Sequence, residues 1–295
     1  MPKPYRVFIT GADRGIGREL ALRLSRDDVR VFVTGLDAEA LKQLASECGN
    51  PNAWAVCDVR SGDQIQAAIE QASACMSCID AVVANAGIAR QMTIDDPDLD
   101  AELDVTLDVN FRGAVRTARA ARPYLAETHG YMLFISSAAG LVNPPLMVPY
   151  NVSKNAVRAF AETFRFEVMP EGIDVGVATF TELDTEMTRT GFATVAGDYL
   201  LTVTLKMGRK VILQRRILPV AKLEPAIAAL ANGIKHRRRH IHSPRRVLGL
   251  RLFAPFVQRL LIEPFIRPRM AKALKLAHEE RGQRTTILPP LDPTG

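Results

Sequence analysis

Thr10-Gly11-Ala12-Asp13-Arg14-Gly15-Ile16-Gly17 is the stretch that decides the fold, because it joins a short apolar run to a helical pattern. Gly11 permits a tight turn, and Gly15 and Gly17 let the backbone and the helix start approach a pyrophosphate closely. A helix N-terminus favours negative charge, so the loop predicts a dinucleotide-binding site. A glycine-rich loop is a weak signal alone, and a plain tight turn is the alternative; its place between a strand and a helix favours the binding loop.

The rest of the chain alternates short apolar runs with longer helical patterns. Because the apolar runs are continuous, they are typical of strands buried on both faces of a parallel sheet. The alternation predicts a doubly wound, Rossmann-type α/β fold with three layers, whose ligands bind at the carboxyl ends of the strands. Strands are predicted at residues 6–10, 29–34, 53–57, 79–84, 131–136, 174–179 and around Ile241, and helices at 15–26, 38–48, 61–77, 98–128, 150–169 and 224–235.

The length of 295 residues, 47% of them hydrophobic, suits one large domain with a single core. We expect a Rossmann-type domain over residues 1–243, with a mobile substrate lid at about 182–218, where clean periodicity is lost. A basic, amphipathic extension and tail are predicted over residues 244–295. No apolar run reaches the roughly 18 residues that cross a bilayer, and no secretory signal is expected at the start.

The cysteines favour a reducing compartment, because a chain of this size needs no disulfides, and we therefore expect a cytoplasmic protein. The four cysteines are Cys48, Cys57, Cys75 and Cys78, and the last two form a lone CxxC pair. A metal site would need a second ligand pair at suitable spacing, and none is evident. No metal is predicted.

Positive charge is concentrated near the C-terminus. Between Lys235 and Lys275 there are twelve Lys or Arg and one acid, Glu263, so this segment has a net charge of +11. Because the whole chain has a net charge of +6, the remaining residues carry −5. Basic residues flanking the apolar stretch 247–266 suit peripheral attachment to an anionic inner-membrane surface. The alternative is a solvated charged face over an apolar strip that is buried in a dimer or against the core. Nucleic-acid binding is not expected, since the recognised motifs are missing.

The end of the second strand bears on the choice of cofactor. NAD-binding loops place an acid there to hold the ribose hydroxyls, but here the position is Gly35, and Asp37 comes two residues late. Arg14 supplies a positive charge that suits a 2′-phosphate. Leu36 stands where a second arginine would be useful. NADP(H) is therefore favoured, with NAD(H) as the alternative.

Tyr150 and Lys154 form a candidate catalytic pair, because positions i and i+4 share one helical face. An ammonium near a phenol favours the phenolate, so we expect the Tyr150 pKa to lie below its ordinary value of about 10. Ser137 ends the fifth strand, where its hydroxyl can hydrogen-bond a carbonyl oxygen. Each residue taken alone could be incidental, as a surface pair or a strand-end hydroxyl.

Six motifs in one order make the sequence similar to the short-chain dehydrogenase/reductase family. They are the glycine loop 10–17, Asp58-Val59, Asn85-Ala86-Gly87, Asn110, Ser137, and Tyr150-x-x-x-Lys154. The match covers roughly residues 5–241. It departs from the family after the sixth strand, where Thr179-Phe180-Thr181-Glu182 lacks the usual Pro-Gly, although Asp184-Thr185 keeps the downstream pattern.

The resemblance implies a role for each matched residue. Tyr150 would be the acid/base, Lys154 would lower its pKa and bind the nicotinamide ribose, and Ser137 would position the substrate carbonyl. Asn110 would support a water-linked proton path through Lys154. The implied cofactor contacts, besides Tyr150 and Lys154, are Gly11, Asp13, Arg14, Gly15, Ile16, Gly17, Asp58 at the adenine, Val59, Asn85, Ala86, Gly87 and Thr185.

The activity implied is hydride transfer between NADP(H) and a secondary alcohol/ketone or aldehyde, in a homodimer or homotetramer. A lipophilic substrate such as a steroid, retinoid or acyl chain is expected from apolar residues that would cover a pocket, or else would simply pack: Phe180, Met187, Phe192, Tyr199 and Leu200. A ketoacyl-type reductase is the second enzyme reading. A cofactor-bound scaffold without turnover is the alternative from another class.

Overall fold

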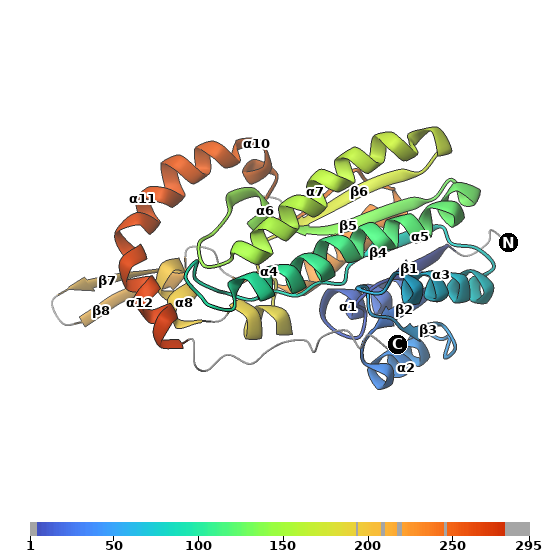
Figure 1. Cartoon of the computed structure of the whole chain (residues 1–295), viewed down its shortest axis with the longest axis horizontal. Helices are drawn as coiled ribbons and strands as arrows, with labels where there is room; N and C mark the ends of the chain where they lie inside the picture. Colours follow the sequence, from blue (N-terminus) through green and yellow to red (C-terminus); the bar gives the residue numbers. More distant parts are fainter. Residues whose placement is uncertain (1–4, 193, 208–209, 217–219, 245–246, 281–295) are drawn as a thin grey trace.

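A seven-stranded parallel sheet forms the centre of the protein, in a computed structural model that describes residues 5–192, 194–207, 210–216, 220–244 and 247–280 (Figure 1). The strand order is β3-β2-β1-β4-β5-β6-β9. From β1 the chain adds β2 and β3 on one side and then β4 and the later strands on the other, as in doubly wound folds. The predicted fold class is confirmed. The strands are β1 (Arg6–Ile9), β2 (Arg30–Gly35), β3 (Trp54–Val56), β4 (Ala81–Ala84), β5 (Tyr131–Ser137), β6 (Asp174–Phe180) and β9 (His240–Ser243).

Helices cover both faces of this sheet. Successive side chains of a strand point to opposite faces, so in β1 Phe8 packs into one core cluster while Val7 and Ile9 pack into the other. The Phe8 cluster lies under α3 (Gly62–Met76), α5 (Gly113–Thr128) and α7 (Val148–Val168). The opposite cluster lies under α1 (Gly15–Ser25), α2 (Ala38–Glu47) and α9 (Leu223–Lys235).

The long helix predicted at 98–128 is interrupted by a π-helical turn. It runs as α4 (Leu99–Leu107), the π-turn η1 (Asp108–Arg112) and α5. A π-turn takes up one residue more than an α-turn and so rotates the side chains that follow it. Asn110 lies in this turn and is buried.

The segment without clean periodicity contains a helix and a hairpin that the sequence pattern did not predict. After the short α6 (Ala139–Val142), α7, the 3₁₀ turn η2 (Met169–Glu171) and β6, the chain forms η3 (Thr188–Phe192) and α8 (Val195–Leu201). An antiparallel pair, β7 (Thr202–Met207) and β8 (Lys210–Arg216), follows. Its register shifts between Leu205 and Lys206, and such a bulge breaks the alternation by which a strand is recognised.

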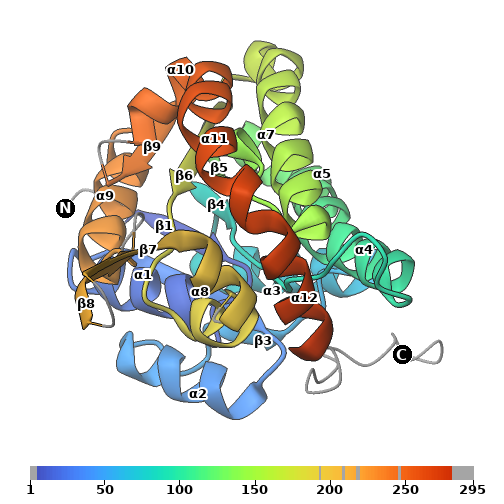
Figure 2. The ribbon, with the colours of Figure 1, turned by 90° about the vertical axis from the view of Figure 1, so that its left-hand side faces the viewer.

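The C-terminal extension runs across the molecule beyond the end of the sheet where β5 and β6 finish (Figure 2). It consists of α10 (Val247–Val257), the π-turn η4 (Gln258–Ile262), α11 (Glu263–Ile266), the 3₁₀ turn η5 (Arg267–Arg269) and α12 (Met270–Glu280). Ala273 and Ala277 of α12 pack with Ala196 and Leu200 of α8 and with Leu146. In the described part of the chain, no helix is both long and apolar enough to cross a membrane.

The ion pair between Arg6 and Asp80 joins the starts of β1 and β4. The Asp80 carboxylate accepts hydrogen bonds from the Arg6 backbone N–H, Nε and Nη2 at 2.7–2.9 Å, and about an eighth of each side chain is exposed. Removing one partner of a nearly buried pair leaves the other charge poorly solvated. We expect Asp80→Ala to lower the free energy of unfolding by about 3 kcal/mol in urea titrations.

The matched control is Asp27→Ala, which breaks the more exposed pair between Asp27, in the turn after α1, and Arg23 in the last turn of that helix. This change should lower the free energy of unfolding by less than about 1 kcal/mol. Equal effects of the two substitutions would show that the Arg6–Asp80 pair contributes no more than a surface pair.

Candidate active site

The glycine loop between β1 and α1 has the geometry of an anion cradle. Gly11 and Gly15 have φ angles of +62° and +59°, a backbone region that side-chain-bearing residues rarely adopt. A Cβ on Gly11 would lie 2.6 Å from Ala86 Cα, and one on Gly17 would collide with the Gly11 carbonyl oxygen. No side chain caps α1, so its first N–H groups can receive a phosphate. The loop therefore fits the pyrophosphate that the sequence predicts.

Asn85 and Ala86 hold this loop in place. Asn85 Nδ2 donates to the carbonyl oxygens of Thr10, at 2.9 Å, and Gly11, at 2.8 Å. The Thr10 hydroxyl in turn accepts hydrogen bonds from the backbone N–H groups of Asn85, at 3.0 Å, and Ala86, at 3.1 Å. The carboxyl ends of β1 and β4 are thereby locked together, and the Asn85 amide is used for structure rather than left free for a ligand.

An acid from the glycine loop, Asp13, lies at the end of β2, where the sequence itself has Gly35. The Asp13 carboxylate accepts from the backbone N–H groups of Leu36, at 3.3 Å, and Asp37, at 3.4 Å. A Cβ on Gly35 would lie 2.7 Å from Asp13 Cγ, so the missing side chain makes room for this carboxylate. Arg14 is exposed beside it, with Nη1 3.8 Å from Glu186 Oε1. The corner at the end of β2 thus carries both signs of charge.

Asp58, the predicted adenine contact, is bound by a residue that sequence reasoning missed. Arg60 is nearly buried, and its Nε and Nη2 donate to the Asp58 carboxylate at 2.6–3.1 Å. The one feature of the sequence that could have indicated this pair is the position of Arg60, two residues after Asp58. Val59 packs against Gly113, where a Cβ would lie 2.8 Å from Val59 Cγ2. This contact seats the β3 end against the end of the π-turn.

Tyr150 and Lys154 lie on the first turns of α7, and both are buried. Lys154 Nζ lies 5.6 Å from the centre of the Tyr150 ring and donates to the Ile135 carbonyl oxygen at 3.1 Å. A Cβ on Gly87 would lie 3.3 Å from Lys154 Nζ. The sequence-predicted pair therefore meets the ends of both β4 and β5.

Asn110 connects the π-turn to the same helix. Its Oδ1 accepts from the Ile88 N–H at 2.7 Å, while its Nδ2 donates to the Ile88 carbonyl oxygen and to Ser153 Oγ, both at 2.9 Å. Ser153 donates to the Tyr150 carbonyl oxygen at 2.8 Å. Sequence reasoning missed Ser153, whose only signal is its place beside Lys154. This chain of bonds fixes the start of α7 relative to β4.

Ser137, at the end of β5, hydrogen-bonds the Tyr150 hydroxyl. Burial raises the pKa of Tyr150 to about 12; the Ser137 hydrogen bond lowers it and the Glu182 charge raises it further. The pKa of Tyr150 therefore lies above its ordinary value of about 10, and not below it as expected, because loss of hydration disfavours the phenolate. Burial likewise lowers the pKa of Lys154 to about 8.

The loop that lacks the family's Pro-Gly is held by a β-bridge. Asp184 N donates to the Ala221 carbonyl oxygen at 2.9 Å, and Ala221 N donates to that of Glu182 at 2.8 Å. Thr185, the predicted cofactor contact, is buried, and its hydroxyl lies 3.3 Å from the Thr188 hydroxyl. Its side chain is thus occupied within the loop in this structure.

The apolar residues predicted to cover a pocket have different places. Met187 packs in a cluster with Ala89, Met147 and Tyr150. Phe180 belongs to the sheet core, which corrects its expected place at the pocket, since it ends a central strand. Leu200 and Tyr199 pack on α12. The side chain of Phe192 lies outside the described residues.

The burial of Lys154 predicts a conflict between stability and function. Its pKa in the folded protein, about 8, lies below the ordinary 10.5, so below pH 8 the fold bears the full penalty of burying an ammonium. We expect Lys154→Met to raise the free energy of unfolding at pH 7 by roughly 2–3 kcal/mol in denaturant titrations. The gain should shrink as the pH rises from 8 toward 10.5, where the lysine is neutral in both states. A loss of stability at pH 7 would contradict this.

The comparisons with known proteins agree with this geometry. A model of the short chain dehydrogenase family matches residues 5–196. The chain is 29% identical over 244 residues to 11-beta-hydroxysteroid dehydrogenase 1A of Arabidopsis thaliana, covering 81% of this chain and 68% of that protein. It is 28% identical over 262 residues to Dehydrogenase/reductase SDR family member 7B of Bos taurus, covering 84% and 77%. This chain belongs to the short-chain dehydrogenase/reductase family and is an oxidoreductase that acts on CH–OH groups with a nicotinamide dinucleotide.

Proposed function

We propose that this protein interconverts a secondary alcohol and a ketone, or an aldehyde, with NADP(H). The observation that carries the proposal is the Ser137–Tyr150 hydrogen bond beside buried Lys154, at the same sheet edge as the glycine loop. When bound, the nicotinamide supplies the hydride for reduction or accepts it in oxidation. The glycine loop and the α1 N-terminus would hold the pyrophosphate, and Lys154 the nicotinamide ribose.

Tyr150 is the proton donor to a carbonyl oxygen. Because its pKa is about 12, the phenol keeps its proton at neutral pH until a stronger base forms beside it, and an alkoxide is such a base. The Ser137 hydroxyl donates to the same oxygen and stabilises its developing charge. Lys154 is mostly charged at pH 7, so its ammonium stabilises the phenolate that remains, and Asn110 supports proton return through Lys154.

The substrate we propose is lipophilic: a steroid, a retinoid or an acyl chain. Ala89, Met147 and Met187 surround Tyr150 with apolar surface, and apolar walls with few polar groups suit such ligands. Several relatives are named hydroxysteroid dehydrogenases, which supports the same class. A ketoacyl-type reductase is the second candidate. We further propose a cytoplasmic location and a homodimer or homotetramer.

Replacing the Tyr150 hydroxyl should abolish turnover while leaving cofactor binding intact. We expect Tyr150→Phe to lower kcat by about 10²- to 10⁴-fold, the usual contribution of a general acid, in assays of NADPH oxidation with a panel of lipophilic ketones. NADPH binding, measured by fluorescence, should stay close to that of wild type. Tyr124→Phe, at a partly buried position of α5 that packs against the core, is the matched control and should keep full activity. If Tyr150→Phe matches wild type on an accepted substrate, the assignment of the donor is wrong. If wild type and Tyr150→Phe are equally inactive on every ketone while both bind NADPH, the scaffold alternative gains support.

The preference for NADP(H) should depend on Arg14. A guanidinium that pairs with the 2′-phosphate contributes about 1.5–3 kcal/mol, so Arg14→Ala should weaken NADPH binding by at least roughly tenfold and leave NADH binding unchanged. Arg26→Ala, at the other end of α1, is the control and should change neither affinity. Tighter binding of NADH than of NADPH by wild type would overturn the cofactor choice and give Asp13 the role of holding the ribose hydroxyls.

A further inference from the structure

The C-terminal extension carries a strip of exposed apolar side chains along α10 and η4. Thirteen large hydrophobic residues are exposed in the described part of the protein, and nearly half lie within the fourteen residues 248–261. Between 49% and 66% of the surface of each of these residues is exposed, so about half or more of each remains uncovered by the rest of the described chain. This set, called the apolar strip below, comprises Leu248, Leu252, Phe253, Phe256, Leu260 and Leu261.

The strip is an outer face and not a loosely packed core. On the inner side of α10, Val247 and Ala254 are buried. A kink at Phe253, where φ is −123° and ψ is 18°, separates Leu248 and Leu252 from Phe256, so it is their exposure that places all three on the outer side. Leu260 and Leu261 lie in the π-turn η4 that follows, and they are exposed as well. The extension thus has two apolar faces, one turned inward and one outward.

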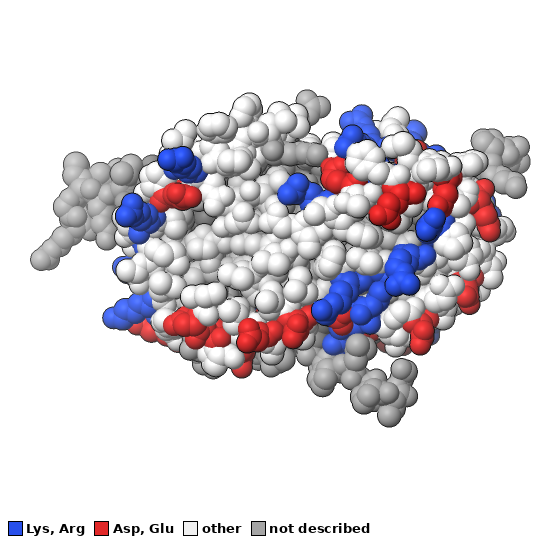
Figure 3. Space-filling model, turned by 45° about the horizontal axis from the view of Figure 1, so that its top comes forward, with Lys and Arg blue, Asp and Glu red and all other residues white. Residues whose placement is uncertain are grey.

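Cationic groups accompany the strip. Residues 244–275 contain eight Lys or Arg and one acid, Glu263. Arg259 lies within the strip and is exposed, and Arg267 is exposed further along. Figure 3, which faces this side, shows a largely uncharged surface on the left with scattered basic groups, while most acidic groups lie along the lower edge and to the right. A second copy docked through this face would bring cations against cations, whereas anionic lipid would neutralise them.

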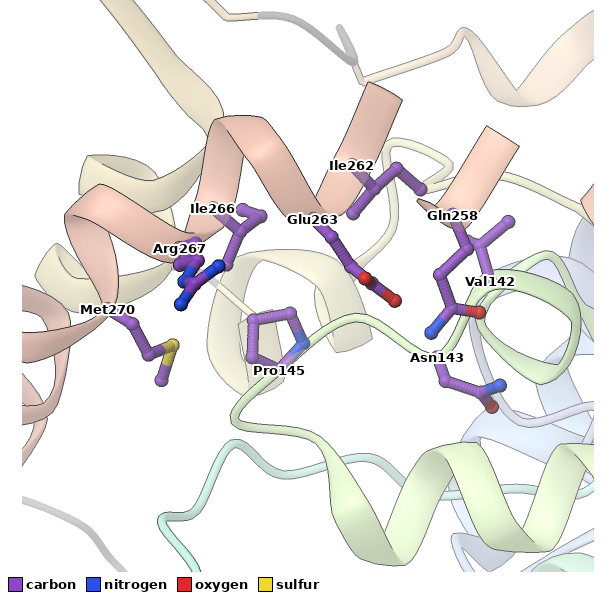
Figure 4. A pocket seen from close by; sticks show the side chains of 9 residues that line it. All are labelled: Val142, Asn143, Pro145, Gln258, Ile262, Glu263, Ile266, Arg267 and Met270. Atoms are coloured by element: carbon purple, nitrogen blue, oxygen red, sulfur yellow. The ribbon is translucent and has the colours of Figure 1, made fainter. Parts of the chain in front are cut away.

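A pocket of about 460 Å³ lies directly behind the extension (Figure 4). Its walls are the loop that follows α6 and the inner sides of η4, α11 and α12, with apolar side chains from Val142, Pro145, Ile262, Ile266 and Met270. The volume is in the range of small-molecule sites. The same loop continues through Met147, which packs with Tyr150, so the pocket lies between the outer strip and the catalytic helix.

We propose that α10, η4 and α11 dock in the plane of an anionic bilayer surface. The apolar strip enters the boundary between headgroups and acyl chains, and the arginines beside it face lipid phosphates. The pocket then opens next to the membrane, where a lipophilic molecule is concentrated. Docking of this kind needs no membrane-spanning helix and no turnover, so it is tested separately from the proposed activity.

Vesicle flotation of the full chain tests the proposal. Wild type should float with phosphatidylcholine vesicles that contain about 30% phosphatidylserine, and less with phosphatidylcholine alone or in high salt. The double variant Phe256→Glu/Leu260→Glu should lower the bound fraction at least roughly tenfold, since it puts two acids in the strip. The matched control is Phe166→Glu on α7, where the phenylalanine is as exposed as Phe256, and it should float like wild type. Thermal melting with NADPH confirms that each variant folds.

Three results would overturn the proposal. They are failure of folded wild type to float with anionic vesicles, flotation of the double variant equal to that of wild type, and equal loss of flotation in Phe166→Glu. Analytical ultracentrifugation without lipid identifies the main competitor. If wild type does not float and is an oligomer while the double variant is a monomer, the strip is an interface between copies of this chain.

Discussion

Burial of two side chains that prefer water, the phenol of Tyr150 and the ammonium of Lys154, is the constraint on which the site depends. Loss of hydration penalises the charged form of each, so the pKa of Tyr150 rises to about 12 and that of Lys154 falls to about 8. Their protonation at neutral pH follows from this: a neutral phenol that can give a proton, and an ammonium that remains mostly charged. The fold must bear an unfavourable buried lysine to obtain that arrangement, as active sites commonly do.

The surrounding architecture holds this pair at one edge of the sheet. Parallel strands bring their carboxyl ends together, so the glycine loop after β1, Asn85 after β4 and Ser137 at the end of β5 are neighbours although they are far apart in sequence. The π-turn supplies Asn110, whose bonds through Ser153 fix the start of α7. The C-terminal extension packs on α8 and on Leu146, and so closes the same edge from outside.

Features that repeat along the chain could be predicted from the sequence, and features that depend on depth or on distant partners could not. Continuous apolar runs predicted the parallel strands, and the spacing of Tyr150 and Lys154 predicted a shared helical face. The direction of the Tyr150 pKa shift was predicted wrongly because it depends on how deeply α7 packs. The Asp13 carboxylate beside Gly35 and the Arg60–Asp58 pair arise from side-chain placement in loops. The β7–β8 hairpin was missed because its alternation is broken by a bulge.

Burial, and not the charge of Lys154, is the main determinant of the Tyr150 pKa in the cofactor-free protein. The most direct test is a pH titration followed by ¹³C NMR of protein labelled at tyrosine Cζ, with Tyr150→Phe used to assign the signal. We expect the Tyr150 pKa to lie near 12, above the ordinary phenol value of about 10. A pKa at or below 10 in the cofactor-free protein would contradict it and restore Lys154 as the group that sets the acid strength of the phenol.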